Sequence, residues 1–166
     1  MGNYNNFESE FIERTIMLID QYYDIVNGYH FDEQFNYTLM INCFLGLIIM
    51  PKEKILKLIP ETRLTQQFKK EIGLELTEIG ENIKNLRELI DELRHSIAHF
   101  DVNIRSENDR NNIDWIDFNN KKKNRLVAKF KSTELRPFLN YYSGVMLGKL
   151  HKKKKHMKTT EYLGPE

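Results

Sequence analysis

Residues 78–100 read EIGENIKNLRELIDELRHSIAHF, and this stretch decides the fold class. Its apolar residues recur at alternating steps of four and three, which is the spacing of one face of an α-helix. They are Ile79, Ile83, Leu86, Ile90, Leu93, Ile97 and Phe100. The spacing predicts one long amphipathic helix over residues 78–99, with Thr77 as its cap and this stripe as its core face.

Two further helices are expected before this stretch. The first begins at Phe7, has Asn5 or Asn6 as its cap and stops at Asn27-Gly28. Its expected core face consists of Phe7, Phe11, Leu18, Tyr22 and Ile25. The second covers about residues 33–50 and is apolar nearly all round, which is typical of a buried central helix.

The hydrophobic period changes after Phe100. Three short β-prone runs, residues 102–105, 112–118 and 125–130, are separated by polar turns, which predicts a small antiparallel meander. A last helix is expected from somewhere in residues 132–137 to about Leu150. The expected fold is therefore mainly α, a bundle of four to five helices with a small β-meander inserted before the last helix. Residues 1–150 are expected to form one domain, and residues 151–166 a basic, flexible tail.

Composition restricts the class of protein. The 25 Lys and Arg residues against 24 Asp and Glu leave a formal net charge of +1, so no overall field attracts nucleic acid or anionic membranes. Apolar residues make up 40% of the chain, too many for global disorder, and the single cysteine, Cys43, excludes a disulfide framework. The longest apolar stretch, residues 39–50, is too short to span a membrane, and the N-terminus lacks the features of a signal peptide. A cytoplasmic protein without a membrane segment is expected.

One cluster is suited to phosphate or proton chemistry: Arg94, His95 and His99, at the end of the long helix. At roughly 100° per residue, the two histidines share a face opposite the core stripe, and Arg94 lies at its margin. Imidazole transfers protons near neutral pH, and guanidinium binds phosphate oxygens bidentately. The residues alone also fit a plainer interpretation, in which the histidines are solvated and Arg94 forms a salt bridge with Asp91.

A metal site is a competing interpretation of the same histidines. Histidines four residues apart can chelate zinc, and Asp101 offers one more ligand. The metallopeptidase pattern, however, needs a glutamate directly after the first histidine, and Ser96 stands there. We therefore expect neither a metal nor a cofactor.

The sequence Arg94-His95-Ser96-Ile97-Ala98-His99 resembles the Arg-x4-His signature of the HEPN superfamily (higher eukaryotes and prokaryotes nucleotide-binding), including the polar residue after the arginine. Residues 101–105 and 133–138 further resemble a single-domain, plasmid-associated branch, so the likeness spans most of the chain. The resemblance implies a helical homodimer that joins two copies of the motif helix in one cleft and cleaves RNA without a metal ion.

The resemblance also assigns roles and a setting. Arg94 would hold the scissile phosphate, His99 would act as general acid or base, and His95 would be a polar accessory. The setting would be a toxin–antitoxin system or phage defence, with a cognate antitoxin or regulator as partner. Asp101 replaces the tyrosine that is modified in the branch paired with a nucleotidyltransferase antitoxin, so adenylylation at this site is not expected. Because inactive members exist, a non-catalytic dimer that binds RNA, nucleotide or a partner protein is the alternative.

Two basic runs complete the candidate RNA-binding residues. The first lies at the expected hairpin tip and consists of Lys121, Lys122, Lys123 and Arg125, and the second, in the tail, consists of Lys152, Lys153, Lys154 and Lys155. Such runs attract the RNA backbone, although most charge runs are simply solvated. A Gly-rich phosphate loop, a nucleophile elbow and paired cysteines are all missing from the sequence, which argues against a nucleotide kinase, an α/β-hydrolase and a zinc ribbon.

Overall fold

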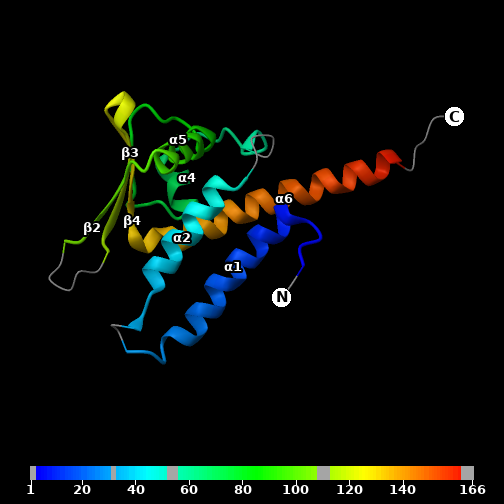
Figure 1. Ribbon diagram of the computed structural model, residues 1–166. Helices are drawn as coiled ribbons and strands as arrows, with labels where there is room; N and C mark the ends of the chain where they lie inside the picture. Colours follow the sequence, from blue (N-terminus) through cyan, green and yellow to red (C-terminus); the bar gives the residue numbers. More distant parts are fainter. Residues whose placement is uncertain (1–2, 31–32, 52–55, 108–112, 162–166) are drawn as a thin grey trace.

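Helices dominate the computed structural model, which describes residues 3–30, 33–51, 56–107 and 113–161, with side chains as far as Lys152 (Figure 1). The α-helices are α1 (Phe7–Val26), α2 (Asn36–Ile49), α4 (Gln66–Glu71), α5 (Leu86–Ala98) and α6 (Leu135–Glu161). The strands are β1 (Glu78–Ile79), β2 (Val102–Arg105), β3 (Trp115–Asn120) and β4 (Arg125–Lys131), and the short 3₁₀ turns are η2 (Lys121–Lys123) and η3 (Ser132–Glu134). The expected mainly α fold with a small antiparallel sheet before the last helix is confirmed.

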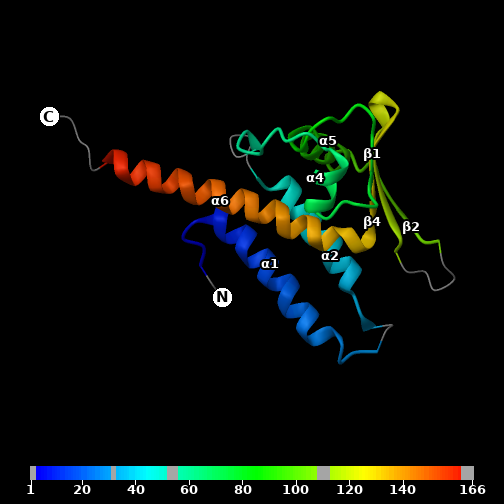
Figure 2. The ribbon, with the colours of Figure 1, turned by 180° about the vertical axis from the view of Figure 1, so that it is seen from behind.

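The sheet has the strand order β1-β4-β3-β2, with antiparallel neighbours throughout. One row of its inner face runs from Ile104 through Ile116 to Phe130. Strands β2, β3 and β4 form the expected meander, although Asn112, where the second strand was expected to begin, lies outside the described residues. Figures 1 and 2 show the helices on one side of this sheet, with α6 starting beside β4 and crossing α1 and α2.

Four phenylalanines join the helices to the sheet in the core. Phe44 of α2 lies with its ring centroid 5.5 Å from Phe118 of β3, 5.4 Å from Phe130 of β4 and 6.2 Å from Phe138 of α6. All four side chains are fully buried, as is Leu93 on the facing side of α5. The core therefore fixes α5 between α2 and the sheet.

The predicted long helix over residues 78–99 is wrong in its first part, because α5 begins only at Leu86. Glu78 and Ile79 pair with β4, and a Cβ atom at Gly80 would collide with the carbonyl oxygen of Leu126. The cap is Asn85, whose side chain accepts a hydrogen bond from the Glu88 amide at 3.0 Å. The expected cap Thr77 instead donates its hydroxyl to the buried Glu134 at 2.7 Å.

The predicted core face of α1 is wrong for most of its residues, although Phe11 is partly buried against the core as predicted. Asn6 caps the helix as expected, but Phe7, Leu18 and Ile25 are 47%, 50% and 58% exposed. The buried residues lie on a second apolar stripe that includes Ile12 and Ile19. Because α1 carries two apolar stripes, periodicity alone could not show which one packs against α2 and α6.

The last helix is longer than predicted. Helix α6 continues past Leu150 to Glu161, through the basic run that was expected to lie in a flexible tail. Lysine is a good helix former, and a core-facing stripe is not needed to extend a helix that is already nucleated. Within the described ranges, no helix combines the length and the apolar character needed to cross a bilayer.

Candidate active site

Helix α5 presents the two motif histidines on its outer side. His95 is partly buried and His99 is exposed, and their ring centroids are 4.4 Å apart with the ring planes tilted by 57°. Leu89 and Leu93, on the opposite side of the helix, are fully buried in the core. The two imidazoles therefore face solvent side by side, where each can exchange a proton with a bound substrate.

Arg94 has partners in the protein itself. Its Nη1 atom lies 2.7 Å from the carbonyl oxygens of Ile48 and Ile49 and 3.1 Å from that of Pro51. The last carbonyls of a helix have no partner within the helix, and α2 has no basic residue in its last turn. The guanidinium of Arg94 thus caps the C-terminal end of α2, where a positive charge is favourable.

Arg94 and His99 consequently point in different directions. Five residues at about 100° each separate the two side chains by roughly 140° around the helix axis. The structure places the arginine against α2 and the histidines on the outer face of α5. One chain therefore offers its cation and its proton-transfer groups on different sides of the motif helix.

The end of α5 exposes a large aromatic ring beside His99. The Asp101 amide donates to Ser96 O at 2.8 Å and the Phe100 amide to Ile97 O at 3.1 Å, which closes the helix with a Schellman motif. This motif gives Phe100 a φ of 58°, a conformation that usually requires glycine. The expected place of Phe100 in the core stripe is wrong, because it is 86% exposed.

The first basic run docks onto the motif helix. Lys123 Nζ and Arg125 Nη2 lie 2.9 Å and 2.5 Å from Glu92 Oε1, and Lys121 Nζ lies 3.1 Å from Asp101 Oδ1. The sequence interpretation missed these carboxylates, because the pairs join residues 20 to 33 positions apart. Three of the four cations in this run therefore already have protein partners.

These contacts keep the two carboxyl groups ionised. Burial by itself would raise the pKa of Glu92, but hydrogen bonds from Asn120 and Lys123, with the charges of Arg125 and Lys123, lower it below its usual value. The pKa of Asp101 is lowered in the same way, with burial outweighed by hydrogen bonds from the backbone and side chain of Lys121. The link between hairpin and helix is therefore ionic at neutral pH.

The remaining basic residues of the two runs are less involved in ion pairs with the protein. Lys122 is exposed and has no ion pair within the described part of the chain, and Lys152 on α6 is also exposed. The side chains of Lys153, Lys154 and Lys155 lie outside the described ones. The structure thus brings Lys121, Lys123 and Arg125 to the motif helix and places Lys152 on a different element.

The side chains that are described form no group of three or more His, Cys, Asp or Glu residues able to hold a metal ion. Asp101, the further ligand considered for a zinc site with His95 and His99, is hydrogen-bonded to Lys121. Bound in this way, its carboxylate is directed at the hairpin.

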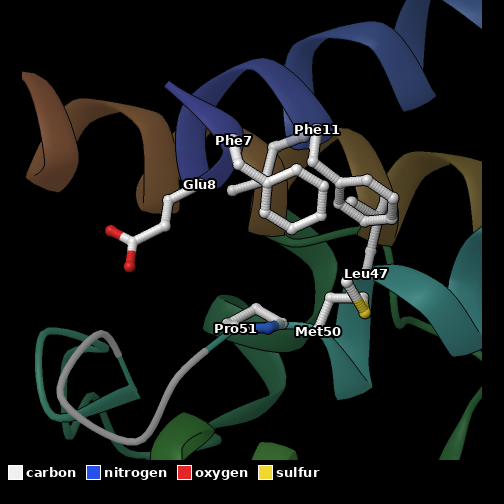
Figure 3. A pocket seen from close by; sticks show the side chains of 7 residues that line it. Phe7, Glu8, Phe11, Leu47, Met50 and Pro51 are labelled. Carbon is white, nitrogen blue, oxygen red and sulfur yellow. The ribbon is translucent and has the colours of Figure 1, made fainter. Parts of the chain in front are cut away.

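An apolar pocket lies away from the histidines, between the start of α1 and the end of α2. Figure 3 shows the rings of Phe7 and Phe11 above Met50 and Pro51, with the Glu8 carboxylate directed away from the rings. No motif residue lines this pocket, although the Pro51 carbonyl is one of the acceptors of Arg94. Its lining suits apolar contact and offers no pair of proton-transfer groups.

Comparison with known protein families supports the resemblance seen in the sequence. A family model described as HEPN pEK499 p136 matches residues 1–153, which include all of the motif helix, the sheet and most of α6. No curated protein and no solved structure matches the chain.

Proposed function

This chain belongs to the HEPN pEK499 p136 family, and on that premise we propose that it is a metal-independent endoribonuclease. The observation that carries the proposal is the pair of adjacent, solvent-facing imidazoles of His95 and His99 on the helix that also bears Arg94. A toxin–antitoxin or phage-defence setting in the cytoplasm is part of the proposal. The free, buried thiol of Cys43 fits a reducing compartment.

The reaction uses the 2′-hydroxyl of the RNA as its nucleophile. His99 takes the proton of this hydroxyl, the 2′-oxygen bonds to phosphorus, and the bond from phosphorus to the 5′-oxygen breaks. A second imidazole, protonated beforehand, gives its proton to the departing 5′-oxygen. The products are a 2′,3′-cyclic phosphate and a 5′-hydroxyl, with Arg94 stabilising the phosphate charge and His95 as a polar accessory.

The proposal includes a homodimer through the motif helix. A second copy would bring another Arg94 and another His99 to the same phosphate, which supplies both a base and an acid. Within one chain, Arg94 and His99 point in different directions, so a second copy is needed to bring both kinds of side chain to one phosphate. Phe100 supports it too, because its exposed ring beside His99 is a surface that a second copy would cover.

RNA contacts away from the cleaved bond are assigned to the two basic runs. Lys121, Lys122, Lys123 and Arg125 lie beside the motif helix, and Lys152, Lys153, Lys154 and Lys155 extend along α6. Cations at these positions would bind phosphates without regard to sequence. A cognate antitoxin or regulator would act by covering this surface.

One observation favours a different function. The Nη1 atom of Arg94 is engaged with three backbone carbonyls, which is a structural role for the arginine of the motif. In a non-catalytic HEPN dimer, the same residue would only hold α2 against α5. Such a protein would bind RNA, nucleotide or a partner protein without cleaving RNA.

Cleavage of RNA in the presence of a chelator tests the proposal. We expect His99→Ala to lower the cleavage rate about a hundredfold or more, the usual size of a lost acid–base group, and His95→Ala to cost less. The control is His30→Ala, which removes an exposed histidine outside the motif. Full activity of His99→Ala would show that the motif is not the site, and a pure wild-type protein that cleaves no RNA would favour the binding protein. Loss of activity in chelator would restore the zinc interpretation.

A further inference from the structure

A polar pocket lies at the end of the sheet, next to the motif helix. Four asparagines line it, Asn103 of β2, Asn119 and Asn120 of β3 and Asn124 after η2, together with Lys121 and Arg125. Its cavity volume is about 290 Å³ and it is open to solvent. We call it the asparagine pocket.

Asp101 connects this pocket to the histidines. Its backbone oxygen accepts a hydrogen bond from the Asn119 amide at 2.9 Å, and its carboxylate binds both the amide and the ammonium group of Lys121. Asp101 follows His99 by two residues along the chain. A nucleotide in the pocket would therefore be next, along the RNA, to the phosphate bound at His99.

The local backbone explains only two of the four asparagines. Asn120 accepts a hydrogen bond from the Lys123 amide and donates to Glu92, and Asn124 has a φ of 45°, which asparagine tolerates better than most residues. Asn103 and Asn119 stand in strands, where asparagine is disfavoured. Their side-chain amides make no hydrogen bond to any described residue, so both donor and acceptor are left for a ligand.

Arg125 also lines this pocket. Its Nη2 atom donates to Glu92, but its Nε is buried and has no hydrogen-bond partner in the described structure. A buried N–H group without a partner is costly, and few occur in native proteins. Because this Nε is buried, the contribution of Arg125 to the pocket is the charge of its guanidinium group.

Resting on the proposed RNA cleavage, we propose that the asparagine pocket binds an unpaired nucleobase of single-stranded RNA adjacent to the cleaved bond. A carboxamide presents a donor and an acceptor side by side, which matches the paired donor and acceptor on the edge of a base. Lys121 lines the pocket and is 71% exposed although it is paired with Asp101, so it would supply a cation for the phosphate of this nucleotide. Asn103 and Asn119 thereby determine which base precedes or follows the cleaved bond.

Binding of uncleavable RNA tests the pocket without depending on catalysis. Fluorescent 2′-O-methyl oligonucleotides of A, C, G and U are titrated against the full chain, and fluorescence anisotropy reports the affinities. The wild type is expected to prefer one base about tenfold, the scale of one bidentate amide contact. The double variant Asn103→Ala/Asn119→Ala should lose this preference, while Asn140→Ala, an exposed asparagine on α6, should keep it. Equal melting temperatures of the variants confirm an intact fold.

The outcomes separate this inference from the proposed cleavage. A wild type without base preference, or a double variant that retains it, overturns the pocket even if the protein cleaves RNA. Loss of the preference in the double variant supports the pocket even if the wild type cleaves nothing. Displacement of the oligonucleotide by a mononucleotide of the preferred base at equal concentration would show that the ligand is a free nucleotide and overturn the assignment to RNA.

Discussion

Arg94 is expected to stabilise the fold as well as the transition state. Its Nη1 group has two N–H donors, shared among the carbonyls of Ile48, Ile49 and Pro51 at 2.7, 2.7 and 3.1 Å. At about 1.5 kcal/mol for each hydrogen bond from a charged group, Arg94→Ala should lower the free energy of unfolding by about 3 kcal/mol. For a domain of this size, that corresponds to a fall in Tm of roughly 6–12 °C.

Thermal melting followed by circular dichroism measures this effect. The matched control is Arg63→Ala, because Arg63 is exposed and its side chain makes no hydrogen bond in the described part of the chain. Arg94→Lys keeps a cation for the end of α2 and should recover most of the Tm, but it loses bidentate phosphate binding and should remain slow in cleavage. A melting temperature of Arg94→Ala within about 2 °C of the wild type would refute the capping of α2.

Three other predictions concern stability and assembly. The pKa of Glu92 is lower in the folded protein than in the unfolded chain. Its contribution to the free energy of unfolding is therefore present above its unfolded pKa of about 4.3 and is lost as the pH falls through the lower folded value. The difference in Tm between wild type and Glu92→Gln should therefore be constant above about pH 5 and shrink below about pH 4, and a constant difference down to pH 3 would contradict it. Glu134 is only 8% exposed and accepts hydrogen bonds at 2.7, 2.8 and 2.7 Å from Leu76 and Thr77. Glu134→Ala should therefore cost about 3 kcal/mol in chemical denaturation and Glu134→Gln less, and equal losses in the two variants would argue against these hydrogen bonds. Sedimentation should give about twice the 19.9 kDa chain mass, and Phe100→Asp should give the monomer; a wild-type monomer at micromolar concentration would contradict the shared cleft.

Helical periodicity predicted which segments form helices better than it predicted where those helices begin or end and which of their faces is buried. Leu86, Ile90 and Leu93 were correctly assigned to the core, but the stripe also continued through Ile79, which pairs in a strand with a partner about 50 residues away. No local pattern reveals such a pairing. A signal for the true start was nevertheless present, since Asn85 followed by Glu88 is a typical helix cap.

The candidate site was predictable only as far as it depends on α5 itself. The helix geometry alone puts His95 and His99 on the outer face, as the structure has them. The engagement of Arg94 with α2 and of Glu92 with the hairpin depends on chain segments brought together by the fold. The asparagine pocket has the same origin, because its residues come from three consecutive β elements.

The chemistry of the cut ends tests the central claim most directly. Once a cleaved bond has been mapped, a single 2′-deoxyribose is placed on its 5′ side in an otherwise unchanged RNA, and the products are analysed by mass spectrometry in the presence of chelator. Cleavage through the 2′-oxygen predicts that this one bond becomes resistant, and that the normal RNA gives a 2′,3′-cyclic phosphate and a 5′-hydroxyl. Continued cleavage at the deoxy position, or products with a 5′-phosphate, would contradict the mechanism assigned to His99.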